Sequence, residues 1–139
     1  MSTYKFNYED KEYILGDKNC SDLINDDEKP VDGVSISQIL GILNKAEDVD
    51  FDIEYYQEAC PECLAGVKEK QKFFGFLEYH FYIFTKNGKY IISDIEKEYA
   101  GLSFNKLSRA GKVDNSYIVS IIICEKCQDY IIQIENCIV

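Results

Sequence analysis

Four of the six cysteines stand in two Cys-x-x-Cys pairs, Cys60 with Cys63 and Cys124 with Cys127. Six cysteines scattered at random over a chain of this length would give about 0.2 such pairs, so two pairs indicate a selected arrangement. Two residues between thiols allow a tight turn to point both sulfurs at one metal ion, and two such turns complete a tetrahedron. The spacing therefore predicts that these four residues are the ligands of one structural zinc ion.

Two other kinds of chemistry use the same residues. Four thiolates also suit a rubredoxin-like iron site, which leaves iron open as the alternative metal. The segment Cys60-Pro61-Glu62-Cys63 is similar to the dithiol motif of glutaredoxins. Thioredoxin-like folds also place a cis-proline against that motif, and neither Pro30 nor Pro61 follows it in this chain. A dithiol or iron redox protein is the alternative to a zinc-stabilised one.

The remaining residues that could take part in catalysis or metal binding do not indicate any particular reaction. His80 is the only histidine and lies within an apolar segment, where we expect a packed or edge position. Cys20 and Cys137 are too few to form a second metal site, and we assign them no role. The chain has no glycine-rich phosphate loop, nucleophile elbow or His-Glu-x-x-His motif. The sequence favours a protein that is not an enzyme.

Strand patterns flank both cysteine pairs. Residues 51–55 alternate between apolar and acidic side chains and lead into the first pair, while the second pair separates two Ile-rich segments, 116–124 and 128–139. Both faces of these last segments are apolar near the junction, which predicts a central position in a sheet. Between the pairs, Asn87-Gly88 joins segments 79–85 and 89–95 and predicts a type I′ hairpin turn.

Two helices are expected against this sheet. Ser35 and Gln38 form a capping box at the start of a helix over residues 35–47, and a second helix is expected over 103–110. The opening residues 4–15 predict another hairpin, and the polar residues 17–33 predict a loop with one short helical turn. The expected fold class is α+β, with an antiparallel sheet built from hairpins and two helices packed on it.

The two Cys-x-x-Cys turns and the C-terminal hairpin resemble the knuckles of zinc-ribbon proteins. Ribbon knuckles usually have glycine directly after the second cysteine, where a positive φ lets backbone N–H groups reach a sulfur. Leu64 and Gln128 occupy those positions here. The pairs are also separated by residues 64–123, far more than a ribbon loop, so the predicted zinc site would clamp together distant parts of a larger domain.

The chain as a whole is similar to a small family of uncharacterised bacterial proteins, known only as a domain of unknown function. The similar segments are 55–66 with Cys-Pro-Glu-Cys, the aromatic hairpin 76–94, and 111–130 with Val-Asp-Asn-Ser-Tyr and Cys-Glu-Lys-Cys. This resemblance implies a bacterial, cytoplasmic setting and no particular activity.

Composition narrows the class of partner. The 139 residues suit a single zinc-stabilised domain over residues 1–139, and no apolar run is long enough for a membrane span. With 15 basic and 25 acidic residues the net charge is −10, which disfavours nucleic-acid binding. The aromatic density of residues 73–84 exceeds the needs of one sheet face. We therefore expect a protein partner, basic in character, or self-association.

Overall fold

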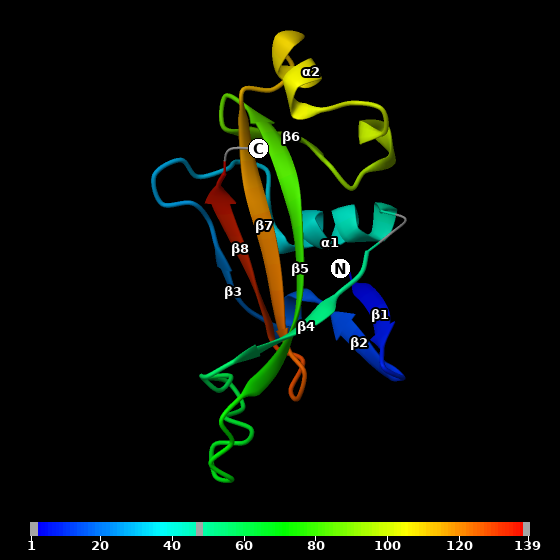
Figure 1. Ribbon diagram of the computed structural model, residues 1–139. Coiled ribbons are helices and arrows are strands. Elements are labelled where there is room, and N and C mark those ends of the chain that lie inside the picture. Colours follow the sequence, from blue (N-terminus) through cyan, green and yellow to red (C-terminus); the bar gives the residue numbers. More distant parts are fainter. Residues whose placement is uncertain (1–2, 47–48, 138–139) are drawn as a thin grey trace.

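The main element of the computed structural model is a six-stranded sheet with the strand order β3-β8-β7-β5-β4, in which β6 pairs with the second half of β5 (Figure 1). Residues 3–46 and 49–137 are described. The sheet strands are β3 (Cys20–Ile24), β4 (Asp52–Tyr56), β5 (Phe74–Lys86), β6 (Lys89–Ser93), β7 (Asn115–Cys124) and β8 (Tyr130–Asn136). Single 3-10 turns are formed by Asp17–Asn19 and Lys97–Tyr99.

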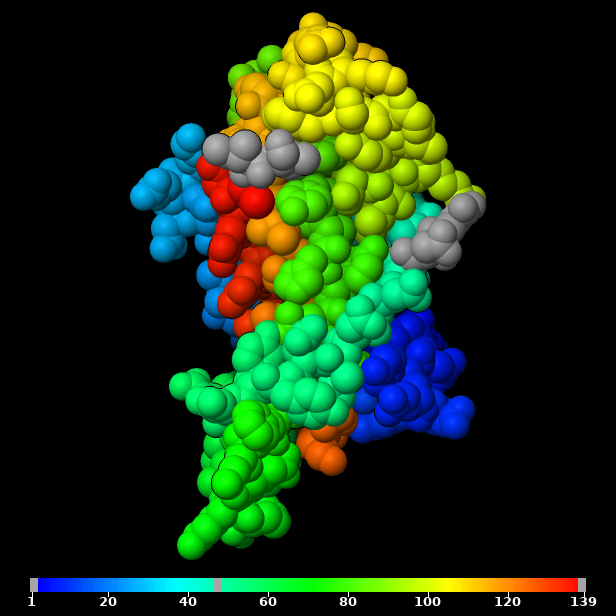
Figure 2. All heavy atoms as spheres, viewed as in Figure 1, coloured from blue at the N-terminus to red at the C-terminus, as the bar shows by residue number. Residues whose placement is uncertain are grey.

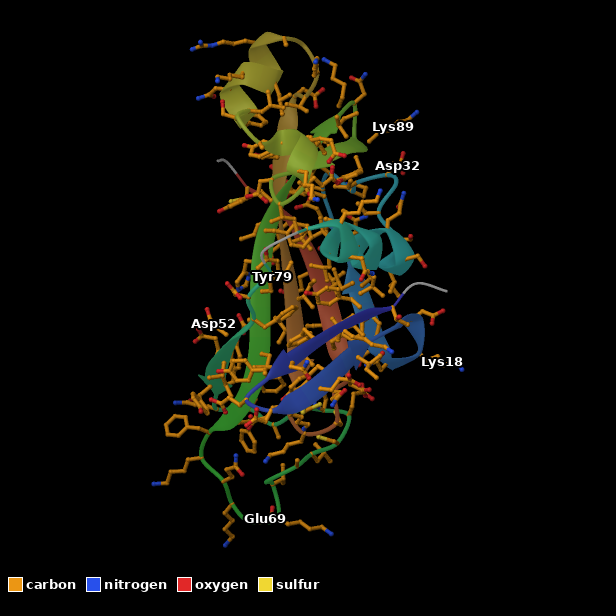
Figure 3. All side chains as sticks on the ribbon, turned by 90° about the vertical axis from the view of Figure 1, so that its right-hand side faces the viewer. Lys18, Asp32, Asp52, Glu69, Tyr79 and Lys89 are labelled. Carbon is orange, nitrogen blue, oxygen red and sulfur yellow. The ribbon has the colours of Figure 1, made fainter. Side chains whose placement is uncertain are left out.

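The two faces of this sheet are covered differently. On one face lie α1 (Ile36–Lys45) and a separate two-stranded hairpin of β1 (Tyr4–Tyr8) and β2 (Lys11–Leu15). Figure 2 shows the opposite face, on which parts of β5, β7 and β8 are open to solvent, and Figure 3 shows from the side that α1 lies against one face. The short helix α2 (Phe104–Arg109) packs at one end of the open face against Phe84.

The principal core lies between α1, the hairpin and the covered face. Alternate residues of β5, β7 and β8 point into it, as the strand period of two requires. The helix contributes a stripe of buried aliphatic residues spaced by three and four positions. The core residues that are 0% exposed are Leu15, Ile39, Leu40, Leu77, Ile83, Val119, Ile121, Ile123, Ile132 and Ile134.

The sheet is mixed, and the expectation of a purely antiparallel sheet was wrong. β3 pairs with β8 in parallel, whereas the other pairings are antiparallel. β3 lies within residues 17–33, which the sequence predicted as a loop. Its pattern is weak because it is an edge strand: only Leu23 and Cys20 pack against the core, while Ser21, Asp22 and Ile24 are exposed.

The strongest local predictions are confirmed. Asn87 and Gly88 have φ angles of 54° and 79° and join β5 to β6, as a type I′ turn requires. Ser35 caps α1 with the predicted capping box, and the helix ends at Lys45 with Ala46 as its C-cap. The predicted helix end at Glu47 lies outside the described residues, as do the last two residues of the strand predicted over 128–139.

Removal of the α1 cap is expected to destabilise the protein. Ser35→Ala deletes the hydroxyl that accepts the Gln38 N–H and should lower the free energy of unfolding by about 1 kcal/mol. Ser37→Ala is the matched control, because Ser37 is exposed within the helix and alanine is the better helix former there. Urea unfolding measures both; equal stability of the two variants would show that the cap contributes nothing.

Candidate metal centre

Two hairpin loops bring the cysteine pairs together. Cys60 and Cys63 lie in the loop between β4 and β5, and Cys124 ends β7 directly before the loop to β8. β5 and β7 are antiparallel neighbours, so the start of β5 lies beside the end of β7, with Phe76 opposite Cys124. Both loops therefore emerge at the same end of the sheet, although more than fifty residues of chain separate them.

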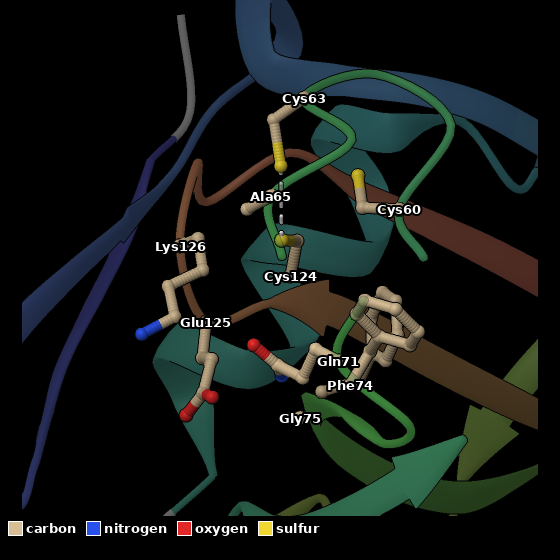
Figure 4. Close-up of a pocket in the computed structure, with 10 residues that line it drawn as sticks. Cys60, Cys63, Ala65, Gln71, Phe74, Gly75, Cys124, Glu125 and Lys126 are labelled. Atoms are coloured by element: carbon tan, nitrogen blue, oxygen red, sulfur yellow. Dashed lines mark hydrogen bonds between the residues drawn. The ribbon is translucent and has the colours of Figure 1, made fainter. Parts of the chain in front are cut away.

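The four sulfur atoms form one cluster, in which all lie within 4.8 Å of one another. The sulfurs of Cys60 and Cys127 are 3.7 Å apart, and those of Cys63 and Cys124 are also 3.7 Å apart. A tetrahedral zinc ion with Zn–S bonds of about 2.3 Å sets its sulfurs about 3.8 Å apart. Figure 4 shows the side chains of Cys60, Cys63 and Cys124 converging. The four cysteines could therefore hold a metal ion.

Each pair folds into the same knuckle. The Leu64 N–H donates to the carbonyl of Cys60, and the Gln128 N–H donates to the carbonyl of Cys124. Leu64 and Gln128 have positive φ angles of 51° and 65°. The knuckle conformation is thus present at both positions where the sequence lacks the usual glycine, and each non-glycine residue there adopts a strained left-handed backbone.

Backbone N–H groups also point at the sulfurs. Asp129 N–H donates to Cys127 Sγ at 3.4 Å. Burial alone would raise the pKa of Cys63, but the Ala65 N–H and the adjacent thiols outweigh it and hold this pKa below the usual cysteine value. Burial raises the pKa values of Cys124 and Cys127. Four thiolates this close repel one another, so full ionisation of the cluster requires a cation at its centre.

The space within the cluster is small. Cys60 and Cys124 are 6% and 4% exposed, and the second cysteine of each pair is more accessible. A cavity of about 10 Å³ is lined by Cys60, Cys63 and Cys124 together with Phe74 and Phe76. That volume is room for about one water-sized sphere. The cavity that these three cysteines share is thus about the size of a single ion or water molecule.

The N-terminal hairpin binds the second knuckle, which the sequence did not indicate. The Gln128 side chain accepts from the Ile14 N–H at 3.3 Å and donates to the Glu12 carbonyl at 3.0 Å. Lys11 Nζ donates to the Glu125 carbonyl at 2.6 Å, and Asn19 donates to the Gln128 carbonyl at 2.9 Å. These contacts explain glutamine rather than glycine at position 128, and they were not foreseeable because they join residues more than a hundred positions apart.

The remaining candidates lie outside the cluster. Cys20 donates its thiol to the Asp22 carbonyl on β3, and Cys137 follows β8. His80 is on the open face of β5, where its ring contacts Ser120 at 2.8 Å and Glu78 at 3.0 Å.

The fold and the cluster together define a mixed-sheet α/β protein, with two helices in the described residues and four cysteines that could hold a metal ion. The chain matches, over residues 4–139, the family described as protein of unknown function (DUF3785), and it belongs to that family. This confirms the resemblance inferred from the cysteine segments. No curated protein and no solved structure matches the chain. Within the described residues, no helix combines the length and apolarity needed to cross a membrane.

The two left-handed residues are expected to respond oppositely to glycine. Leu64→Gly should raise the free energy of unfolding by up to about 1 kcal/mol, because the Leu64 side chain is 57% exposed and glycine adopts a positive φ freely. Gln128→Gly should lower it by about 1 kcal/mol, because two side-chain bonds to β2 are lost. Urea unfolding of the purified proteins compares them. A gain in stability from both changes would show that the Gln128 contacts do not stabilise the knuckle.

Proposed function

We propose that Cys60, Cys63, Cys124 and Cys127 bind one zinc ion as a closed structural site, and that the protein acts through protein contacts rather than catalysis. The observation that supports zinc best is the convergence of two matched knuckles, with sulfurs 3.7 Å apart in two pairs. Tetrahedral tetrathiolate geometry is the preferred structural environment of zinc.

A structural role follows from the donor set. Four protein thiolates complete the coordination of zinc and leave no open position for a water molecule or a substrate. The small cavity that Cys60, Cys63 and Cys124 line supports this, since its volume is that of about one water-sized sphere. The ion would instead join the loop before β5 to the hairpin of β7 and β8, and thereby fix one end of the sheet.

The proposal of a protein partner rests on charge and on the open face. The net charge of −10 disfavours nucleic acid, whose phosphates must first be neutralised. The open face of the sheet, parts of which are open to solvent in Figure 2, carries half-buried apolar side chains, among them Ile118, Ile122 and Ile131. Such a face, rimmed by polar groups, is typical of an interaction surface.

A dithiol or iron redox protein is the competing hypothesis. In dithiol proteins of the glutaredoxin type the motif begins a helix, whereas Cys60 precedes a turn here and a second pair faces it. Iron would use the same four thiolates as zinc, so the two metals must be distinguished by measurement. Iron gives visible absorbance, and a redox dithiol gives rapid alkylation of Cys60 at neutral pH. A colourless protein whose Cys60 alkylates slowly excludes both.

Metal content is the direct test. Plasma mass spectrometry of the freshly purified protein should find about one zinc per chain. Cys60→Ser and Cys124→Ser should each lose that zinc and lower the free energy of unfolding by about 3 kcal/mol or more, since each removes one ligand from a shared ion. Cys20→Ser is the control, because Cys20 lies outside the cluster and serine keeps the donor to Asp22.

These variants distinguish one zinc site shared by both cysteine pairs from separate binding of zinc by each pair. Loss of zinc from both cluster variants, with normal zinc in Cys20→Ser, supports a single ion held by both knuckles. Zinc that persists in either cluster variant contradicts the shared site. Stoichiometric iron in the wild-type protein would replace the zinc proposal with electron transfer.

Chelation provides an independent prediction. A strong zinc chelator should lower the melting temperature of the wild-type protein, and added zinc should restore it. The reason is that an ion bound only by the folded state stabilises that state, and this stabilisation is lost when the ion is removed. Amide hydrogen exchange should then increase first in residues 57–73 and 124–129, and only later in the centre of β7. Unchanged melting after complete removal of the metal would contradict a structural role.

A further inference from the structure

Two adjoining hollows lie on the open face of the sheet beside the first knuckle. Their volumes are about 320 and 230 Å³, and they share Pro61, Phe76 and Ile122. The larger one reaches across β8 to β3, and the smaller one extends toward the end of β4. Together they form one groove that crosses the sheet strands at the end where the cysteines gather.

The floor of the groove is apolar. Phe76, Ile122 and Ile131 point outward from three neighbouring strands and are half-buried. Tyr56 lies at one end, where its ring meets Phe76 edge to face with centroids 5.4 Å apart, and it remains 40% exposed. Aromatic and aliphatic side chains that stay accessible in this way provide anchoring sites for a bulky apolar side chain.

The rim of the groove is acidic. The charged residues that line the two hollows are Asp22, Glu58, Glu62 and Asp129. All four are carboxylates, and they come from both sides of the apolar floor. A second copy of this chain would bring its own net charge of −10 to this surface, so charge complementarity favours a basic occupant over self-association.

Further carboxylates continue along the same face. Glu54 and Asp52 on β4 lie opposite Phe76 and Glu78 on β5, so all four side chains share the open side of the sheet. Glu135 on β8 is exposed on this side as well. A basic chain seated in the groove would therefore meet attractive charge beyond its immediate contacts, which raises the association rate at low salt.

We propose that this groove binds an extended basic segment of a partner protein, with one bulky apolar side chain on Phe76 and Ile122 and with Lys or Arg side chains at the acidic rim. This inference rests on the proposed function, because Pro61 and Glu62 belong to the knuckle that zinc would hold in place. It assigns the partner's chemistry and the surface that recognises it.

The test uses a defined probe with the zinc-loaded chain of 139 residues. The probe is a fluorescein-labelled peptide of alternating Lys and Ser around a central Phe, followed by fluorescence anisotropy. We expect micromolar binding that weakens several-fold as ionic strength rises from about 20 to about 300 mM. Replacement of the central Phe by Ala should weaken binding about tenfold, and replacement of Lys by Glu should abolish it.

Matched variants locate the site. Ile122→Thr should weaken peptide binding about tenfold, whereas Ile118→Thr, on the same face of β7 but outside the groove, should leave it within about twofold. Asp22→Asn with Glu62→Gln should weaken binding about fivefold. Asp27→Asn with Glu28→Gln removes the same charge from the exposed loop after β3 and should have no such effect. Thermal melts confirm that each variant is folded.

The outcomes separate this inference from the zinc proposal. Equal loss in the two charge variants would show diffuse charge attraction, and equal loss in the two isoleucine variants would show that binding is not specific to the groove. Either result would overturn the groove, as would no binding by protein that contains one zinc per chain. A stable dimer whose amide shift changes cover Phe76 and Ile122 would make a second copy the occupant and also overturn it. If the chain holds no zinc but the variants behave as expected, the zinc proposal fails while the groove stands.

Discussion

The antiparallel pairing of β5 with β7 is the constraint on which the rest of this structure depends. It extends from Phe76 opposite Cys124 to Thr85 opposite Asn115, and it supplies the centre of both the sheet and the core. The same register places the two loops with the cysteines side by side. A slip of one residue would turn Ile121 and Ile123 from the core to the open face and would also separate the two knuckles. Hydrophobic burial and the cysteine cluster therefore select the same alignment.

The second knuckle connects the metal centre to the N-terminal hairpin. Gln128 has a left-handed backbone conformation, which costs about 1 kcal/mol relative to glycine. Its side chain offsets this cost through hydrogen bonds to two backbone groups of β2. Lys11 reaches the same knuckle through the Glu125 carbonyl. The hairpin forms a sheet of its own and has no strand partner in the main sheet, so these contacts, together with packing on the core, determine where it lies.

Much of the fold was predictable because its determinants are local. The Asn87-Gly88 turn, the capping box at Ser35 and the Ile-rich strand predicted over 116–124 each depend on neighbouring residues, and each is confirmed. The cysteine spacing also predicted which four thiols meet. Non-local determinants were missed: β3 has a weak pattern of its own and is a strand only because β8 offers it a parallel edge. The contacts of Gln128 were not predicted for the same reason, since the residues that it bonds lie at the other end of the sequence.

The difference between the two sheet faces links the metal centre to the proposed partner site. The covered face is filled by α1 and the hairpin, so its residues are already committed to the core. On the open face, the residues after β4 lie beside Phe76 and Ile122, and Pro61 is one of the residues that line the groove. The loop over residues 57–73 contains no helix or strand, and its fixed position would depend on the thiols near its start. An ion bound there would both close the end of the sheet and hold the groove in a shape ready for a partner, which reduces the entropy lost on binding.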